Sequence, residues 1–373
     1  MLKAIRGLST IAIGIGCLLP AMLASSQTRG TETFFVMSNN ADKNQVTEFV
    51  QSSDGTVVAK ETFDTQGRGT GGVNDPLESQ GSLMLSADHT LLFAANAGSG
   101  DITVFQVIGG RLLFLNRQPS GGSDPVAIAL SQNRVYVLNQ GGAGSVVGFQ
   151  IGLHGQLVPI ANSTAFLSAN AVGGSSISIS PDGQTLAVVE RLTNNIDTFH
   201  INQNGTLGSL VVNPSAGVGA FSGQFAPDGK LIISETGSNI SAISSYTVLS
   251  NGKLSAVTQS LTTNGDANCW NAITPNGAFV YASNAGSSNI SGFSIGRSGA
   301  LTPLTSSSVV GSNPENATNL DIAVSGDGKF LYSLNAEVGT VGVFAIQSNG
   351  TLTEVDEIPG FTAAVGFNGI AAL

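Results

Sequence analysis

One aromatic residue recurs through the chain at intervals of 44 to 56 residues, and a glycine follows it each time within five or six residues. The seven aromatics are Phe49, Phe105, Phe149, Phe199, Tyr246, Phe293 and Phe344. The glycines are Gly55, Gly110, Gly155, Gly205, Gly252, Gly299 and Gly350. Most residues before these glycines tolerate a positive φ, which a tight hairpin between two strands requires. Seven matching pairs predict seven copies of one supersecondary unit.

A second turn marks six of the units, between their first and second strands. It reads Ala87-Asp88-His89, Gln132-Asn133, Pro181-Asp182-Gly183, Pro227-Asp228-Gly229, Pro275-Asn276-Gly277 and Gly326-Asp327-Gly328. The first unit starts directly at its second strand, Thr33–Asn39, and the C-terminal stretch Gly369–Ala372 can supply the missing strand. Such pairing closes a ring and removes exposed sheet edges. We therefore predict an all-β, seven-bladed β-propeller of four-stranded blades; a β-sandwich pair or a solenoid fits this period poorly.

The first 26 residues have the pattern of a signal peptide. Lys3 and Arg6 precede an apolar run, Ile11–Leu23, and Ala24-Ser25-Ser26 fits a small-x-small cleavage site. Residues 1–26 are therefore predicted to be removed, leaving residues 27–373 as a single propeller domain. The expected location is extracellular, or periplasmic if the source is bacterial.

Charge and cysteine content restrict the partners. The formal net charge is −10 for the whole chain, and loss of the cations Lys3 and Arg6 makes it −12. Such a surface disfavours nucleic acid and anionic membranes, and no later segment has the length and apolarity of a membrane span. After cleavage Cys269 is the only cysteine, so a disulfide or a cysteine-based metal site is excluded. We expect a monomer that binds a small molecule.

In a four-stranded blade the loops after the second and fourth strands share one face, and here these connections are the long and variable ones. The longest is Asp64–Gly81. Loops that depart from a repeat commonly carry function. One position at the end of each second strand is expected to ring the axis on this face. Its occupants are Asn39, Asn96, Asn139, Glu190, Glu235, Asn284 and Asn335. For the asparagines we favour a capping role at the strand end.

Glu190 and Glu235 break the pattern on adjacent blades. Two neighbouring carboxylates can hold a metal ion, or divide into an acid and a base; alternatively they are solvated loop residues. Arg191 is a natural counter-ion or anion anchor beside Glu190, although a surface ion pair explains it equally well. Trp270 and Phe221 lie near the starts of two inner strands and could wall a pocket, or simply pack between blades. No Gly-x-Ser-x-Gly elbow or His-x-x-x-His metal pair is present.

Four segments carry a resemblance to a known family. They are SPDGQTLAVVE (180–190), APDGKLIISETGSN (226–239), TPNGAFVYASNAGSSNISGFSIGRSGALTPL (274–304) and GDGKFLYSLNAEVGTVGVFAIQSNGTLTEV (326–355). The chain resembles the lactonase family of seven-bladed propellers, which includes bacterial 6-phosphogluconolactonases and fungal carboxymuconate-lactonising enzymes. The resemblance covers essentially all of residues 27–373, and its motifs specify blades.

The chain departs from that family in its basic residues. The family carries histidine before the Ser-Pro-Asp-Gly turn of a middle blade, and Gly173–Ser176 has none. The arginine and histidine that lead into the next blade are replaced around Phe221-Ser222. Glu235 lies near the family's acidic position, so it is a partial match. These losses argue against a phosphorylated sugar or a tricarboxylate as substrate.

The resemblance implies an exported enzyme that opens or forms a lactone of a non-phosphorylated organic substrate at the central funnel. Glu190 or Glu235 would activate water, and Arg191 would stabilise the oxyanion. The expected substrate-binding residues are Asn96, Asn139, Asn284, Asn335, Phe221 and Trp270. The sequence requires no cofactor, but Ca²⁺ or another divalent cation could bind at Glu190 and Glu235. The alternative is a non-catalytic propeller that binds a ligand or presents an interaction surface.

Overall fold

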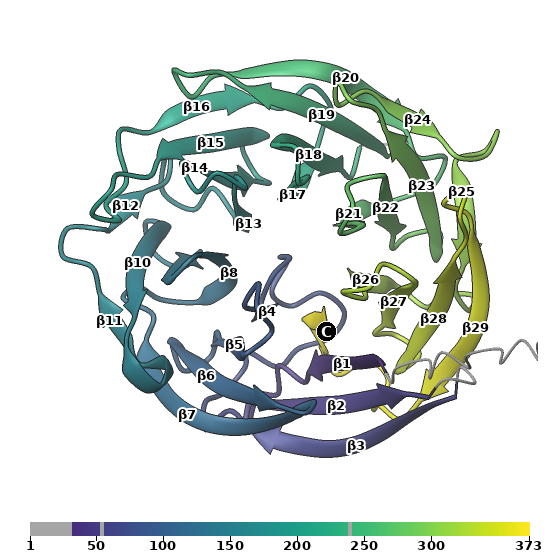
Figure 1. Ribbon diagram of the computed structural model, residues 1–373, viewed down its shortest axis with the longest axis horizontal. Coiled ribbons are helices and arrows are strands. Elements are labelled where there is room, and N and C mark those ends of the chain that lie inside the picture. Colours follow the sequence, from purple (N-terminus) through teal and green to yellow (C-terminus); the bar gives the residue numbers. More distant parts are fainter. Residues whose placement is uncertain (1–31, 53–55, 238–240) are drawn as a thin grey trace, which may run out of the picture.

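The computed structural model describes residues 32–52, 56–237 and 241–373, and these form a ring of seven antiparallel sheets around a central axis (Figure 1). The predicted seven-bladed β-propeller is therefore confirmed. The predicted signal peptide, the turn at Gly55 and residues 238–240 lie outside the described residues.

Each blade has four strands in sequence order from the axis outward, apart from the first. The first three blades are formed by β1 (Glu32–Met37), β2 (Gln45–Gln51), β3 (Val57–Asp64) and β30 (Ile370–Ala372); by β4 (Leu83–Leu85), β5 (Leu91–Asn96), β6 (Asp101–Ile108) and β7 (Arg111–Pro119); and by β8 (Pro125–Ser131), β9 (Arg134–Asn139), β10 (Ser145–Ile151) and β11 (Leu157–Pro159). In the third blade β12 (Ala165–Phe166) also pairs with β10, and a 3-10 turn, η1 (Leu153–Gly155), joins β10 to β11.

The remaining blades repeat this order. They are formed by β13 (Gly174–Ile179), β14 (Thr185–Glu190), β15 (Asn195–His200) and β16 (Val211–Pro214); by β17 (Ala220–Phe225), β18 (Lys230–Glu235), β19 (Ala242–Val248) and β20 (Leu254–Thr262); by β21 (Asn268–Ile273), β22 (Phe279–Asn284), β23 (Asn289–Ile295), β24 (Leu301–Pro303) and the short β25 (Val309–Ser312); and by β26 (Asn319–Val324), β27 (Phe330–Asn335), β28 (Thr340–Ile346) and β29 (Leu352–Pro359).

The ring closes as the sequence predicts. Strand β30 pairs antiparallel with β1, with Phe35 opposite Ala371 and Val36 opposite Ile370. The two ends of the described chain therefore share the first blade, and no inner strand of that blade is left with an open edge.

The repeated aromatic is the main interblade packing residue. All seven aromatics of the third strands are at most 2% exposed. Burying one such ring stabilises the fold by roughly 1.5–3 kcal/mol, so the repeat supplies the core. The turns between first and second strands also behave as expected, because Gly183, Gly229, Gly277 and Gly328 all have positive φ.

Candidate functional site

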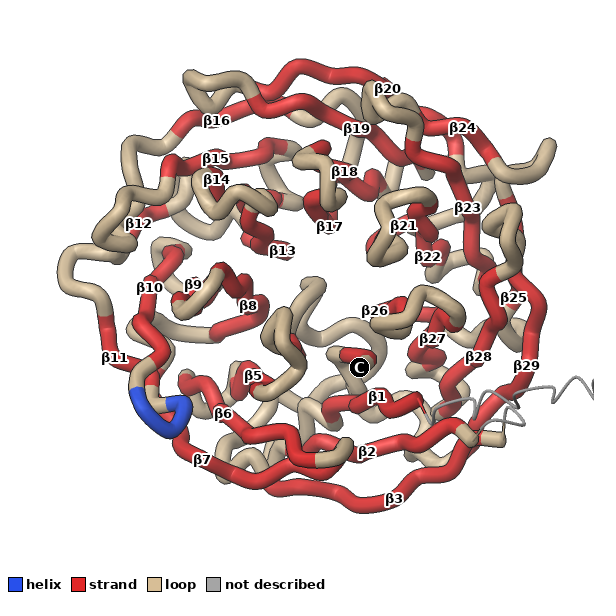
Figure 2. Tube along the Cα trace, in the orientation of Figure 1, coloured by secondary structure: helices blue, strands red, loops and turns tan. Residues whose placement is uncertain are grey.

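The long connection between the first and second blades runs into the axis. Figure 2 shows it as the loop beside β4 at the centre of the ring. Its last residues, Asp75–Gln80, are called the axial segment below. Gln80 donates its backbone N–H to Ser175 O (2.8 Å), and Ser79 Oγ donates to Val126 O (2.9 Å). The departure of this loop from the repeat thus has a structural consequence: it places chain inside the propeller.

Gln80 joins two blades across the axis. Its Nε2 donates to Asn271 O (2.8 Å) and to Asp321 Oδ1 (3.2 Å), while its Oε1 accepts from Asn271 N (3.3 Å). Asp321 is 2% exposed, and burial raises its pKa to about 7 although backbone N–H groups and Gln80 oppose the rise. The contact between Gln80 and Asp321 was not predicted, although an acidic residue within an inner strand was a signal for it in the sequence.

Three ionisable groups meet at the mouth of the axis on the face of the long connections. Arg191, in the loop after β14, forms an ion pair with Glu78 of the axial segment. Asp75 accepts from Asn368 Nδ2 at 2.8 Å. Burial raises the pKa of Asp75 to about 8, and the negative charge of Glu78 adds to the rise. This site therefore combines an acid that keeps its proton at neutral pH with the ion pair of Arg191 and Glu78.

The interpretation of Arg191 changes with this geometry. Its guanidinium pairs with Glu78 rather than with Glu190, its neighbour in sequence. Its Nε is buried and has no hydrogen-bond partner among the described residues. Asp75 and Glu78 were not predicted as site residues, although both lie in the connection that departs most from the repeat.

Trp270 and Phe221 lie beside the axial segment. The indole Nε1 of Trp270 donates to Ser79 O at 2.9 Å, and the two rings pack edge to face with centroids 5.2 Å apart. Trp270 is 1% exposed and Phe221 is 7% exposed. Trp270 thus holds the axial segment directly and Phe221 packs against Trp270, and a direct contact of either ring with substrate stays a prediction. Neighbouring Cys269 is also buried, and burial raises the pKa of its thiol.

The expectation that the repeated second-strand position rings the axis is wrong. All seven side chains are 0% exposed, so none of them presents a surface at the axis. Asn96 Nδ2, for example, donates to Asp101 Oδ1 (2.7 Å) and Thr103 Oγ1 (2.9 Å) on the third strand. The preceding connection covers the position, because a Cβ on Gly67 would lie 2.3 Å from Asn96 Cγ. The capping interpretation of the asparagines is therefore the one that fits.

The same burial applies to the other predicted substrate-binding asparagines. Asn139 reaches Ser120 O at 3.5 Å, Asn284 donates to Asn289 and Ser291, and Asn335 donates to Glu357. Each of these partners belongs to a third or fourth strand or to the preceding connection. These side chains bond within their own blade or to the connection that leads into it, so the funnel wall must be formed by other residues.

Glu235 uses the same position with the hydrogen-bond polarity reversed. Its Oε1 accepts from Ser215 Oγ (2.8 Å) and Gly217 N (2.7 Å), and Ser244 of β19 also donates to the carboxyl. Burial raises the pKa of Glu235 despite these donors. Glu235 has a carboxyl group where five other blades have an asparagine amide, and the neighbouring serine hydroxyls act as hydrogen-bond donors to it.

Glu190 is held by a partner that sequence reasoning missed. Its carboxylate accepts from Ser168 N (2.8 Å), Ser168 Oγ (2.6 Å) and Thr193 Oγ1 (2.6 Å). Asp197 of β15 faces it at 0% exposure, where Thr103 and Ser291 stand in other blades. Burial first, and then Glu190, raise the pKa of Asp197 to about 8. Burial alone would also raise the pKa of Glu190, but bonds from Asp197, Ser168 and Thr193 lower it. Asp197 therefore stays protonated and donates a hydrogen bond to Glu190.

Glu190 and Glu235 consequently sit in separate hydrogen-bond sets on separate blades. Within the part of the chain that the structure describes, no three His, Cys, Asp or Glu side chains group closely enough to hold a metal ion. A cation at Glu190 and Glu235 remains a prediction that ligand-binding measurements must test. In the same described ranges, no helix is long and apolar enough to cross a membrane.

Comparisons with known proteins agree with this fold. The family described as "Lactonase, 7-bladed beta-propeller" matches residues 211–363. No curated protein matches the sequence. Among solved structures, a candidate 6-phosphogluconolactonase from Bacteroides fragilis is 20% identical with a TM-score of 0.71, over 93% of this chain and 99% of its own. One from Bacteroides uniformis is 18% identical with a TM-score of 0.71, over 92% and 99%.

A periplasmic gluconolactonase from Pseudomonas aeruginosa is also similar. It is 19% identical with a TM-score of 0.67, over 91% of this chain and 99% of its own. At these identities the structural likeness establishes the fold alone, whereas the family match rests on sequence. The chain's resemblance to the lactonase family of seven-bladed β-propellers is therefore confirmed, by sequence over residues 211–363 and by fold over the described residues.

Proposed function

We propose that the protein is an exported, lactonase-like enzyme that opens or forms a lactone of a non-phosphorylated organic substrate at the mouth of its central axis. The observation that carries the proposal is the meeting of Asp75, Glu78 and Arg191 at that mouth. These three groups come from the connection that departs most from the repeat and from the loop after β14. The sequence match to the lactonase family supports the reaction class.

The three groups suit the chemistry of lactone opening. Water adds to the carbonyl carbon while its proton passes to the Glu78 carboxylate, and the guanidinium of Arg191 stabilises the oxyanion that forms. The C=O bond re-forms as the ring C–O bond breaks, and Asp75 gives its proton to the departing alkoxide. The proton that Glu78 took from water then returns to Asp75, which restores both groups. A carboxyl whose pKa is raised to about 8 holds that proton at neutral pH. The product is a hydroxy acid, which releases a proton to solution.

Charge at the mouth supports a non-phosphorylated substrate. One guanidinium stands there with two carboxyls, and the chain carries a formal charge of −10. A phosphate group would need more cations to offset its own charge. We therefore propose a neutral or weakly charged lactone, and propose export on the basis of the signal-peptide pattern in residues 1–26.

The test is proton release from a panel of lactones, offered as phosphorylated and non-phosphorylated pairs, with and without chelator. Turnover of the non-phosphorylated members by wild type, and its loss in Arg191→Gln and Glu78→Gln, supports the proposal. Turnover of the phosphorylated members alone would contradict the substrate class. Loss of activity on chelation, with recovery on adding Ca²⁺, would instead support a cation as part of the site.

A second candidate function rests on the axial segment itself. Ser79 and Gln80 occupy the axis and are hydrogen-bonded to four blades, which favours a rigid ligand-binding propeller over an open catalytic funnel. Absence of turnover on every lactone, together with saturable binding that Arg191→Gln weakens, would favour this candidate.

A further inference from the structure

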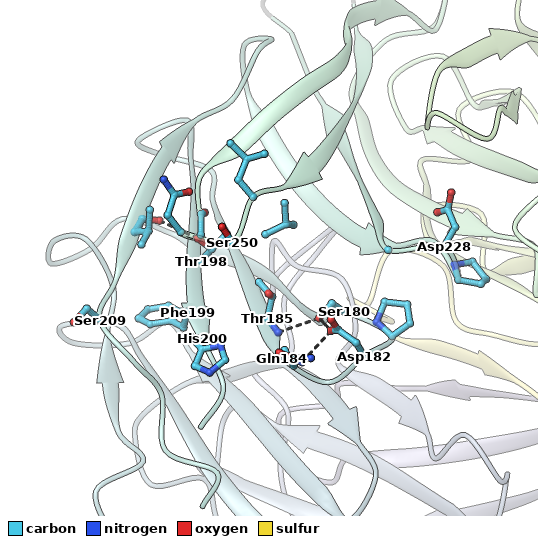
Figure 3. Close-up of a pocket in the computed structure, with 18 residues that line it drawn as sticks. Ser180, Asp182, Gln184, Thr185, Thr198, Phe199, His200, Ser209, Asp228 and Ser250 are labelled. Atoms are coloured by element: carbon cyan, nitrogen blue, oxygen red, sulfur yellow. Dashed lines mark hydrogen bonds between the residues drawn. The ribbon is translucent and has the colours of Figure 1, made fainter. Parts of the chain in front are cut away.

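The face opposite the axial mouth carries a cleft between the fourth and fifth blades. It has a volume of about 710 Å³ and is lined from both blades (Figure 3). The fourth blade contributes the turn Ser180–Thr185, the end of β15 and the residues that lead into β16. The fifth blade contributes the turns at Pro227–Gly229 and Val248–Gly252. This volume lies within the range of small-molecule sites.

The cleft exists because the outer strand of the fourth blade starts late. In the other blades the fourth strand begins one or two residues after the turn glycine, as Leu254 follows Gly252. In the fourth blade β16 begins only at Val211, six residues after Gly205. Leu207 makes a single bridge to Ile201, and the chain then bulges through Gly208 to Leu210.

The late start uncovers the end of the third strand. The register of β15 with β16 runs only from Asn195 to Thr198, so His200 has no strand partner on its outer side beyond one bond from Gly208 N to its carbonyl. His200 is exposed, and Figure 3 shows its ring between Ser209 and the Asp182 turn. The repeat is thus broken here in a way that opens a recess on an otherwise stereotyped face.

The lining of the recess mixes polar and apolar side chains and includes no lysine or arginine among its described residues. Hydroxyl, amide, carboxylate and imidazole groups occur in it together. The side chains of Gln184, His200, Ser209 and Ser250 make no hydrogen bond to any described part of the protein. Exposed Pro181 and Pro227 add apolar surface at the edges.

We propose that this cleft binds a neutral oligosaccharide of two or three units. Sugar hydroxyls both donate and accept hydrogen bonds, and the mixture of Gln184, His200 and Asp228 supplies both kinds of partner. The C–H faces of sugar rings pack on apolar edges such as those of Pro181 and Pro227. The carboxylates of Asp182 and Asp228, in a chain of net charge −10, oppose phosphorylated or carboxylated sugars. The site is separate from the axial mouth and does not depend on the proposed lactonase activity.

A neighbouring cleft provides the control. Between the second and third blades a recess of about 380 Å³ is lined by the equivalent turns, including Gln132 and Asn133. There β7 of the second blade, the strand equivalent to β16, begins at Arg111, one residue after Gly110, so the outer strand is in its regular place. This smaller recess is not expected to bind the sugar.

The experiment is a titration of maltotriose and cellotriose, followed by saturation-transfer NMR and calorimetry, with spermidine as a cationic probe. Four proteins are compared: wild type, the double variant Gln184→Ala/His200→Ala, the filling variant Ser209→Trp, and Gln132→Ala as control. Wild type and the control are expected to bind a trisaccharide. The double and filling variants should bind at least about tenfold more weakly, the effect of losing roughly 1.4 kcal/mol of contacts.

Three results would overturn the proposal. They are failure of wild type to bind either trisaccharide, binding of spermidine alone, and trisaccharide binding that both cleft variants retain in full. An Asp75→Asn variant, altered only at the axial mouth, must keep its trisaccharide affinity. Circular dichroism of each variant verifies that the propeller is intact.

Discussion

Arg191 and Glu78 are separated by 113 residues in sequence, yet their side chains form an ion pair at the mouth of the propeller axis. The pair ties the loop after β14 to the axial segment. It also orients a guanidinium beside Asp75, whose raised pKa depends partly on the charge of Glu78. The long connection therefore does two things: it fills the axis with Ser79 and Gln80, and it brings ionisable groups to one place on the rim.

Replacement of Gln80 by alanine is expected to destabilise the protein by about 2–4 kcal/mol. The variant loses the two bonds that Nε2 donates, to Asn271 O and Asp321 Oδ1, and the bond that Oε1 accepts from the buried Asn271 N–H. Each unsatisfied buried group costs roughly 1–3 kcal/mol. Urea denaturation measures the loss, with Gln132→Ala in an exposed turn as the control, expected within about 0.5 kcal/mol of wild type. Equal stability of the two variants would show that the axial segment does not hold the blades together.

Asp197 gives the stability a dependence on pH. Its pKa is about 8 in the folded protein against the usual 3.8 of an aspartate, so between these values the folded state holds a proton that the unfolded state has lost. Stability is therefore greatest below about pH 4 as far as this group is concerned, and falls as the pH rises to about 8, by up to about 1.4 kcal/mol per pH unit.

The variant Asp197→Asn isolates this effect, because an amide can donate to Glu190 as the protonated acid does and does not titrate. Its stability relative to wild type is expected to rise as the pH increases from about 4 to about 8 and then to level off. Denaturation at several pH values measures the difference. The comparison with wild type is needed because Asp75 and Asp321 also have raised pKa values, of about 8 and about 7. Both therefore make the free energy of unfolding fall with rising pH, as Asp197 does. A constant difference at all pH values would mean that Asp197 is ionised in the folded protein.

The glycines that cover the second-strand ends are expected to tolerate no side chain. A Cβ on Gly265 would lie 2.4 Å from Asn284 Cγ, which is closer than nonbonded atoms approach. Gly265→Ala should therefore cost about 2–3 kcal/mol through overpacking. Gly296 is exposed, and its nearest atom would be Ala300 O at 3.4 Å, so Gly296→Ala is the matched control. If thermal unfolding shows similar losses for both variants, the close cover over Asn284 is not rigid.

The fold could be predicted from the sequence because the repeated residues are those that each blade requires for its own packing and turns. Phe293 and its counterparts pack between blades, and Gly299 and its counterparts among the described residues take positive φ, so spacing alone locates strands and turns. Ring closure could be predicted because the first blade lacks an inner strand of its own and the C-terminal strand is left without a blade.

The candidate site was harder to predict from the sequence, because it depends on contacts between residues that are far apart in the chain. A position at the end of a strand does not reveal which way its side chain points, so Glu190 and Glu235 were expected at the axis and are fully buried instead. Ser168, which donates to Glu190, and Glu78, which pairs with Arg191, come from other connections, which spacing does not relate. Asp197 was recognisable in principle, since an acid stands where other blades carry threonine or serine. The late start of β16 was not recognisable from the sequence, because Leu207 occupies the position at which leucine begins the fourth strand in other blades.

The central claim is that lactone chemistry takes place at the axial mouth and not at the buried glutamates. The most direct measurement is the initial rate of proton release from the best lactone of the panel, compared among wild type, Asp75→Asn, Glu190→Gln and Glu235→Gln. Loss of the general acid is expected to lower the rate of Asp75→Asn at least about 100-fold, while both glutamine variants, if folded, keep a rate close to wild type. An unchanged rate for Asp75→Asn, with activity lost in Glu190→Gln or Glu235→Gln, would contradict the account and return the chemistry to the blade interfaces.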